Sequence, residues 1–369
     1  MKKILLSSAA LTLLAGAAAA EITWSGSATI GYNDDYSDGV FVDSDVDINA
    51  TAELNNGWTA SLTYGIELDN FDNNGATDNY WSEDENLTIS VSNDMYTLTY
   101  GDTEYAAVSY WNGVSDMAFD GFSEVDDEQV LKLDAKFDMF SAGLSTAVDR
   151  DGQTYQLGFG ATATLGMVDL SVAYQEEDAA PATGDIAANG DYNGNEIFGI
   201  SAGTSFGGAD ILVAYAKDNT ADEDSIGIQV SYPVGPVTLT GYYVSESVAS
   251  ATYGDDYTYG LTAAYADGPI EILAHYESAR GEEEYNLEGS YDFGMGLVVT
   301  AGYIDGDDDT DNDFASYIVA EYDLGGGASF LASYADANST AAEMTDDIDT
   351  GLGGYELYSG ATLALSLSF

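Results

Sequence analysis

The stretch VDINATAELNNGWTASLTYGIEL, residues 46–68, decides the fold. Apolar and polar side chains alternate through residues 46–54 and again through residues 58–68, and the segment Asn-Asn-Gly at 55–57 separates the two runs. Alternation with a period of two places one set of side chains on each face of a β-strand. Two such runs joined by a short turn that contains glycine predict an antiparallel hairpin.

The same hairpin pattern recurs along the chain. Eight further pairs of alternating runs follow between residues 87 and 334, and their turns are short and rich in glycine, proline and asparagine. One unpaired run comes before the hairpins, at 22–32, and one after them, at 360–369. The pattern therefore predicts about 20 strands. No helical period and no shift in composition marks a second domain, so residues 21–369 are expected to form one domain.

The connections between these runs differ in length at the two ends of the predicted sheet. The turns within hairpins are short, whereas connections between hairpins, such as 69–85 and 175–195, are long and acidic. A transmembrane barrel has short periplasmic turns and long outer loops, and its strands need about 9–11 residues to cross a bilayer. The sequence therefore predicts an all-β, antiparallel, up-and-down transmembrane barrel with alternating short and long connections.

The width of such a barrel decides which face meets lipid. About 20 strands leave a lumen too wide for side chains to fill, so the apolar set must point outward and the polar set must line water. In residues 131–137 this places Leu131, Leu133 and Phe137 outside and Lys132 and Lys136 inside. In the other strands, the same alternation gives some acids an inward position along their strand, which we call inward parity. These acids are Asp45, Asp47, Glu53, Glu67, Asp169, Glu271, Glu284, Glu288, Asp292, Glu321 and Asp323.

The composition excludes several classes of protein. The chain has 65 Asp and Glu against 7 Lys and Arg, a net charge of -58, which would repel nucleic acid. It has no cysteine, which excludes disulfides and Cys-ligated metals. Its 28 tyrosines argue against general disorder.

The first residues have the pattern of an export signal. Met1-Lys2-Lys3 is basic, residues 4–14 are apolar, and residues 18–20 are three alanines. This order is typical of a cleaved signal peptide, which we expect to span residues 1–20. An N-terminal anchor helix is the alternative, but the apolar stretch is short for it.

With these features the chain resembles the Gram-negative general porins of alphaproteobacteria such as Rhodobacter. The resemblance rests on the leader 1–6, on residues 21–26 (EITWSG), on the Tyr-Gly-Asp step at 100–102 and on the hairpin at 322–329 (YDLGGGAS). It implies an outer-membrane homotrimer of 16-stranded barrels. The count of 20 strands departs from that number, so we expect 16–20.

The resemblance also implies that the third long connection folds into the lumen and narrows it. By order along the chain this is 102–129, which is acidic and aromatic. Porins set an acidic loop of this kind against basic residues of the wall. The expected constriction is Asp102, Glu104, Asp116, Asp120, Glu124, Lys132 and Lys136. The alternatives are an ordinary surface loop, and local pairing of the two lysines with Asp134 and Asp138.

Two further features concern the partners of the barrel. The last strand ends in Phe369, which resembles the signal by which outer-membrane barrels reach the assembly machinery.

Asp307, Asp309 and Asp311 lie in an acid-dense outer loop, where carboxylate oxygens suit Ca²⁺, although a solvated loop is the simpler interpretation. We expect the barrel to contact lipid and lipopolysaccharide.

The expected function is passive diffusion of small hydrophilic solutes and ions through a cation-preferring pore. The main alternative is a substrate-specific channel, in which Tyr105, Tyr110 and Trp111 would stack on a sugar. An enzyme is not expected, because the only histidine, His275, has no serine placed beside it by any known motif. A calcium-binding β-helix is disfavoured, because the chain has no nonapeptide glycine repeat.

Overall fold

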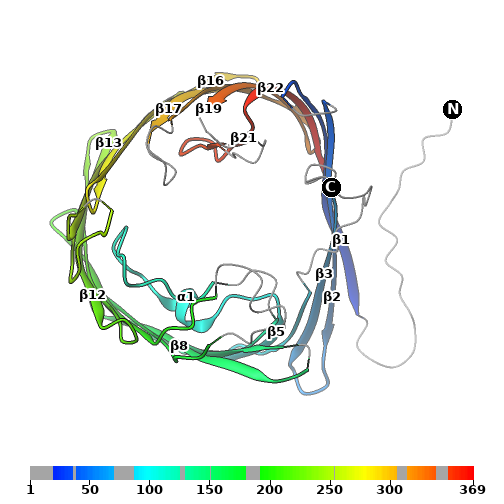
Figure 1. The fold of residues 1–369 in the computed structure, drawn as a ribbon. Helices are drawn as coiled ribbons and strands as arrows, with labels where there is room; N and C mark the ends of the chain where they lie inside the picture. The colour runs from blue at the N-terminus through cyan, green and yellow to red at the C-terminus, as the bar shows by residue number, and fades with distance from the viewer. Residues whose placement is uncertain are drawn as a thin grey trace.

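The protein is a closed β-barrel (Figure 1). The structure is a computed structural model that describes residues 20–35, 39–69, 87–124, 129–149, 151–179, 192–252, 254–305, 314–337 and 348–369. Among these residues, 20 strands form one antiparallel sheet in which each strand pairs with the next along the chain, and the last pairs with the first.

The first half of the barrel contains eleven strands and the single helix of the described residues. These are β1 (Glu21–Asn33), β2 (Val40–Glu53), β3 (Thr59–Asp69), β4 (Thr88–Ser92), β5 (Tyr96–Gly101), α1 (Ala106–Tyr110), β6 (Gln129–Lys136), β7 (Phe140–Val148), β8 (Thr154–Leu165), β9 (Val168–Gln175), β10 (Ile197–Phe206) and β11 (Ala209–Asp218).

The second half completes the barrel and adds a separate two-stranded sheet. The elements are β12 (Glu223–Val234), β13 (Val237–Glu246), β14 (Tyr257–Asp267), β15 (Ile270–Ala279), β16 (Glu282–Gly294), β17 (Leu297–Asp305), β18 (Phe314–Gly325), β19 (Ala328–Ala337), β20 (Ile348–Asp349), β21 (Glu356–Leu357) and β22 (Gly360–Ser368). β20 and β21 pair only with each other.

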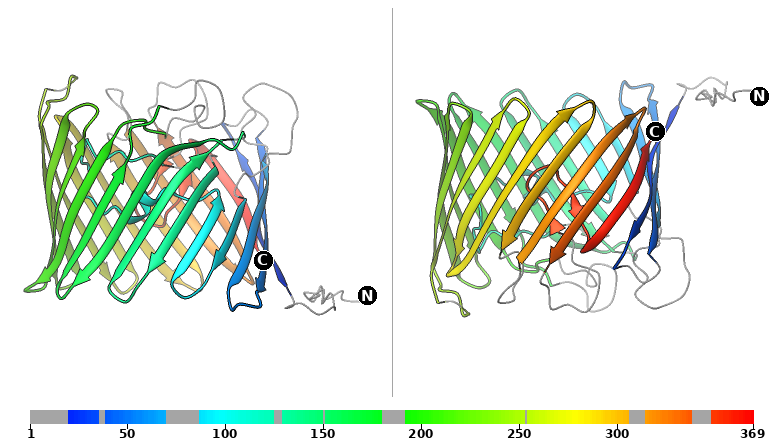
Figure 2. Two further views of the ribbon diagram at one scale, coloured as in Figure 1. Left: turned by 90° about the horizontal axis from the view of Figure 1, so that it is seen from below. Right: turned by 90° about the horizontal axis from the view of Figure 1, so that it is seen from above.

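The predicted fold class is confirmed. The predicted hairpins correspond to the nine pairs from β2–β3 to β18–β19, and the two unpaired runs are β1 and β22. The count of 20 strands is therefore right, and the number 16 implied by the resemblance does not apply to this barrel. The strands are tilted against the barrel axis, as closure of a sheet requires (Figure 2).

The two ends of the barrel differ as predicted, but the alternation of short and long connections is not strict. At one end every connection is a short turn, such as 166–167 between β8 and β9 or 268–269 between β14 and β15. At the other end the connections 70–87 and 176–196 are long, whereas 280–281 between β15 and β16 is as short as a turn. There Arg280 adopts a φ of 52°, so the hairpin closes tightly without a loop.

The barrel closes where the first strand meets the last. β1 pairs with β22 from Ser27 opposite Ser368 to Asn33 opposite Thr362. The N–H of Gly26 donates to the carbonyl of Phe369, and the N–H of Phe369 donates back to the carbonyl of Gly26, both over 3.0 Å. Residues 26–33 of β1 are thus paired with β22, as a hydrocarbon environment requires, whereas residues 21–25 extend past the end of β22 and pair only with β2.

The predicted orientation of β6 is confirmed. Leu131, Leu133 and Phe137 are 38–45% exposed on the outside of the barrel. Lys132 is 8% exposed and points to the inside, where it contacts residues of α1. The apolar set therefore faces outward and the alternate set faces inward.

Aromatic side chains form a continuous contact on the outside of the second half. The rings of Tyr243, Tyr257, Tyr259 and Tyr276 follow one another at centroid distances of 6.1–6.3 Å, near the end with the long connections. At the opposite end, Tyr291 and Phe293 pack with centroids 4.7 Å apart. Aromatic belts at both ends of an apolar band are expected where a barrel meets the membrane interfaces.

Three predicted features fall outside the described residues. They are the signal peptide up to residue 19, the region 125–128 of the third connection, and the Ca²⁺ site at Asp307, Asp309 and Asp311. Among the described residues, no helix is long and apolar enough to span a membrane.

A charge on the outer face should destabilise the barrel. Leu98 on β5 is 44% exposed on the apolar outside, whereas its neighbour Thr97 has the inward parity. We expect Leu98→Arg to lower the free energy of unfolding in lipid vesicles by about 2–4 kcal/mol, because arginine is costly in hydrocarbon. Denaturant titration of the folded barrel measures this. Thr97→Arg is the control, and an equal loss in both variants would contradict the orientation.

Candidate functional site

Residues 102–124 leave the barrel wall and lie inside the barrel, as the ribbon around α1 shows (Figure 1). The chain turns inward at Gly101, the last residue of β5, which has a φ of 129° that residues with a Cβ rarely adopt. From there α1 packs on β7, β8 and β9, and the segment continues along the inner face to β13. We call residues 102–124 the inner segment.

The wall beneath the inner segment is built from small residues. Gly143, Gly160, Ala173 and Gly199 lie side by side on β7 to β10 in one row of the sheet. A Cβ at Gly143 would come within 2.7 Å of the Tyr110 ring, and a Cβ at Gly199 would come within 2.5 Å of the Trp111 ring. Glycine is needed at these positions because the inner segment lies directly against the backbone of the wall.

Hydrogen bonds attach the inner segment to the same strands. The N–H of Ala106 donates to Oγ of Ser145 on β7 over 2.8 Å, and the hydroxyl of Ser171 on β9 donates to the carbonyl of Tyr110 over 2.5 Å. Further along, backbone N–H groups donate to wall side chains, in the pairs Ala118 to Glu246, Phe119 to Ser225 and Ser123 to Gln175. These bonds satisfy backbone donors that a loop inside a barrel would otherwise leave without partners.

Apolar contacts complete the attachment. Val114 and Met117 of the inner segment are buried on the inner face of β11 and β13, against Ala214, Ala216, Tyr242 and Val244. These wall residues have the inward parity although they are apolar. A strand that is apolar on both faces is covered on both faces, so the runs at 213–216 and 242–244 were a sequence signal for this contact.

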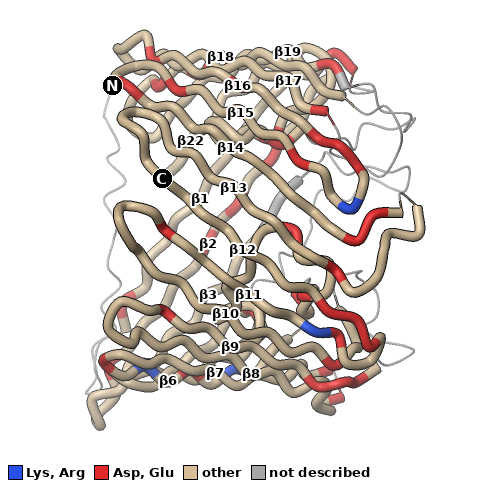
Figure 3. The backbone as a smooth tube through the Cα atoms, turned by 90° about the vertical axis from the view of Figure 1, so that its left-hand side faces the viewer, with Lys and Arg blue, Asp and Glu red and all other residues tan. Residues whose placement is uncertain are grey.

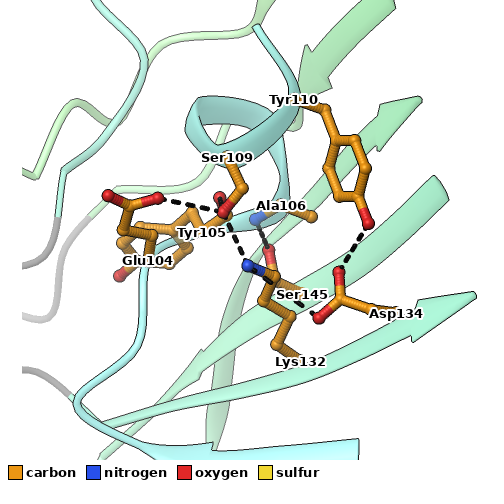
Figure 4. A network of polar contacts seen from close by, with 8 residues as sticks. All are labelled: Glu104, Tyr105, Ala106, Ser109, Tyr110, Lys132, Asp134 and Ser145. Carbon is orange, nitrogen blue, oxygen red and sulfur yellow. Dashed lines mark hydrogen bonds and ion pairs between the residues drawn. The ribbon is translucent and has the colours of Figure 1, made fainter. Parts of the chain in front are cut away.

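Figure 4 shows how Lys132 is placed. Its Nζ donates to Oγ of Ser109 over 2.6 Å and lies 3.9 Å from a carboxylate oxygen of Asp134. The Ser109 hydroxyl lies 3.2 Å from the carboxylate of Glu104, and the Tyr110 hydroxyl donates to Asp134 over 2.9 Å. The pKa of Tyr110 is raised by burial and by the neighbouring Asp134. Lys132 is therefore held by α1 itself and does not face it across open space.

Asp120 is the second polar contact within the inner segment. Its carboxylate accepts a hydrogen bond of 2.8 Å from the indole N–H of Trp111. Burial raises the pKa of this carboxyl to about 6, although the bond from Trp111 acts in the opposite direction. Asp120 thus titrates closer to neutral pH than an ordinary aspartate does.

The other expected constriction residues lie apart from this network. Asp116 and Glu124 are exposed parts of the inner segment, and Asp116 has a φ of 57°. Asp102 follows directly after β5, where its N–H donates to the carbonyl of Leu87 over 3.0 Å. Lys136 is the exposed last residue of β6, near the short turn. The structure therefore joins Glu104 and Lys132 through Ser109 but not Glu124 and Lys136.

A second segment inside the barrel was missed by sequence reasoning. The short sheet β20–β21 lies within the barrel on the side opposite α1 (Figure 1). Its Ile348 and Leu357 are buried against Tyr317, Val319 and Ala335 on the inner face of β18 and β19. We call residues 348–358 the inner hairpin. Apolar residues of inward parity at 317 and 319 were the signal that could have revealed it.

His275 lies on the inner face of β15. Its Nδ1 is 2.8 Å from Oγ1 of Thr262, and its Nε2 is 3.5 Å from the carboxylate of Glu277. Both ring nitrogens thus face wall residues. A cavity of about 290 Å³ lies between this part of the wall and the inner hairpin, and His275, Asn286 and Asp349 are among its lining residues.

Comparison with known proteins gives one family. The family model described as Gram-negative porin matches residues 7–284, which is more than half of the chain. No match is found among curated proteins.

Similar solved structures include mutants of the porin of Rhodopseudomonas blastica. A triple mutant is 18% identical, with 73% of this chain and 98% of that chain covered and a TM-score of 0.48. A double mutant is 18% identical, with 74% and 100% covered and a TM-score of 0.48.

A side chain at Gly199 should push the inner segment off the wall. We expect Gly199→Val to displace the Trp111 ring, because the added Cβ would come within 2.5 Å of it. Fluorescence quenching by acrylamide measures the increased exposure of Trp111 once Trp24, Trp58 and Trp81 are replaced by Phe.

Gly203→Val is the matched control for this experiment. Gly203 lies on the same strand with the same parity, but the nearest atom to its Cβ would be Leu212 Cδ1 at 3.8 Å. Equal quenching in both variants would contradict the contact between Trp111 and the wall.

Proposed function

Because the chain belongs to the Gram-negative porin family, we propose that its barrel is a cation-preferring pore through which small hydrophilic solutes and ions diffuse passively. The family and the closed barrel imply an outer-membrane pore for diffusion. The porin family consists of channels and not of enzymes. The ion preference and the identity of the constriction are our own proposals.

The position of Lys132 is the observation that carries the cation preference. This base was expected to form a positive wall opposite an acidic loop, but it is 8% exposed and bonded to Ser109. Glu104, Asp116 and Glu124 of the inner segment, which lies inside the barrel (Figure 1), are exposed. A solute in the pore would therefore meet carboxylates, which raise the local concentration of cations and repel anions.

The distribution of acids over the whole barrel supports the same preference. On the side drawn in Figure 3, acidic residues gather toward the end with the long connections. Two of the described bases, Lys217 and Arg280, lie at that end, and the Nζ of Lys217 is 2.7 Å from Asp222. Cations would thus be attracted at the mouth as well as at the inner segment.

The aromatic residues of the inner segment favour a general pore over a sugar-specific channel. Tyr105 is 2% exposed, against the wall residues Val130 and Ala147. Trp111 lies over Gly199 and packs edge-on against Phe122 with ring centroids 5.7 Å apart. Rings used in this way hold the segment on the wall, whereas stacking on a sugar needs a free ring face.

The remaining expectations stay predictions. They are the cleaved signal peptide 1–20, the homotrimer, the contacts with lipopolysaccharide, the role of Phe369 in recognition by the assembly machinery, and Ca²⁺ at Asp307, Asp309 and Asp311. The Phe369 side chain is 70% exposed while its backbone closes the barrel, so it is accessible for recognition.

The reversal potential tests the ion preference. With the purified protein in a planar bilayer under a KCl gradient, we expect the reversal potential to approach that of K⁺. The displacement of the reversal potential from zero should become smaller as the salt concentration rises at a constant gradient, because the Debye length falls from about 8 Å at 0.15 M to about 3 Å at 1 M. A reversal potential on the chloride side would reject the proposed preference.

The preference should also depend on pH through Asp120. Since the pKa of this carboxyl is raised to about 6, it is negative above that pH and neutral below it. We expect the permeability ratio of K⁺ to Cl⁻ to fall in a step as the pH decreases through about 6, and Asp120→Asn to remove that step. Glu124→Gln changes an exposed acid of the same segment and should retain it. A step of unchanged size in Asp120→Asn would exclude this residue as its origin.

A further inference from the structure

The turn of the inner hairpin is attached to the wall by a buried carboxylate. Glu288 on β16 is 1% exposed, and its two oxygens accept hydrogen bonds from the N–H groups of Gly351 (3.1 Å) and Leu352 (2.9 Å). The Tyr317 hydroxyl on β18 donates to it over 2.5 Å. A buried carboxylate is costly unless it is hydrogen-bonded, so these three donors and Glu288 depend on one another.

The wall is shaped to bring these groups together. A Cβ at Gly302 on β17 would come within 2.5 Å of the Tyr317 ring and 2.8 Å of Glu288 Cγ, so glycine leaves the space in which the two side chains meet. At Gly351 the fit is equally close, since a Cβ would lie 2.6 Å from both Glu288 Oε1 and Leu273 Cδ2. The contact is therefore specific to these positions.

Other contacts fix the hairpin at its remaining sides. The Tyr355 hydroxyl donates to Glu321 on β18 over 3.1 Å. The Tyr358 ring lies 6.5 Å from that of Phe41 on β2, measured between centroids. Together with the buried Ile348 and Leu357, these contacts attach the hairpin to several strands of the barrel.

The turn of the hairpin is also held by its own hydrogen bonds. The N–H of Thr350 donates to the carbonyl of Tyr355 over 3.0 Å, and the N–H of Tyr355 donates to Oγ1 of Thr350 over 2.9 Å. Gly353 and Gly354 have φ values of 86° and 62°, which allow the chain to reverse between them. The hairpin is thus an ordered element that projects from the wall.

We propose that the inner hairpin is a second constriction element, that the narrowest part of the pore lies between it and the inner segment, and that Glu288 is its positioning residue. The inference rests on the proposed diffusion function. The hairpin and α1 lie on opposite sides of the lumen (Figure 1). Asp349 and Glu356 of the hairpin are exposed, as are Glu104 and Asp116 of the inner segment. Small hydrophilic cations would therefore pass between two acidic elements.

Single-channel conductance of the full chain in planar bilayers tests the role of Glu288. We expect Glu288→Ala to raise the conductance roughly 1.5- to 2-fold and to admit larger polyethylene glycols, because the hairpin is released and the pore widens. Glu288→Gln keeps one of the two acceptor oxygens, so its conductance should lie between that of the wild type and that of Glu288→Ala. Glu271→Ala removes the same charge from an exposed inward position on β15, so it controls for charge alone.

A variant on the hairpin side keeps the test decisive if Glu288→Ala does not fold. Gly351→Val leaves the strands unchanged but brings its side chain against Glu288 and Leu273, so it should also raise the conductance. Heat-modifiable migration on gels reports whether each barrel is folded. Wild-type conductance in both Glu288→Ala and Gly351→Val, or an equal increase in Glu271→Ala, would overturn the proposal. A wild-type protein that forms no channel at all would instead refute the diffusion function.

Discussion

Closure of the hydrogen-bond ladder is the constraint on which the rest of this structure depends. A strand in hydrocarbon has no water to satisfy its backbone, so the sheet must end where it began. Here β1 and β22 meet, and Gly26 and Phe369 exchange two backbone hydrogen bonds. Closure also fixes the side chains, because a strand with neighbours on both sides can only alternate between an outward and an inward face. The exposed Leu131 and Leu133 and the buried Lys132 follow from it.

Closure with 20 strands creates a second problem, because the lumen is too wide for wall side chains to fill. The chain places two of its own connections there, the inner segment and the inner hairpin. Each lies against glycines of the wall, such as Gly199 beneath Trp111 and Gly302 beneath Tyr317. These glycines are therefore needed for the inserted segments to pack on the wall, since a larger residue at the same positions would occupy the space of the segment.

The hairpins and the orientation of the strands could be predicted because period and turn chemistry are local properties of the sequence. The partner of Lys132 could not be predicted. The alternation of side chains along a strand tells which face a residue lies on, but not which residue of another segment contacts it there. Ser109 reaches Lys132 only after the chain has turned inward at Gly101. The inner hairpin was missed for a different reason. Tyr317 and Val319 carry its signal, but a search for one apolar face per strand does not detect a strand that is apolar on both.

The imbalance of charge explains how the inner elements are attached. With 65 acids and 7 bases, most carboxylates of the chain have no cation available as a partner. Glu246 and Glu288 accept hydrogen bonds from backbone N–H groups of the inner segment and the inner hairpin instead. Such bonds stabilise a buried carboxylate without neutralising it. Lys132 on Ser109 and Arg280 over the Phe119 ring are the cations that contact the inner segment among the described residues. The hydrogen bonds to Glu246 and Glu288 add no positive charge to the lumen, as a pore that prefers cations requires.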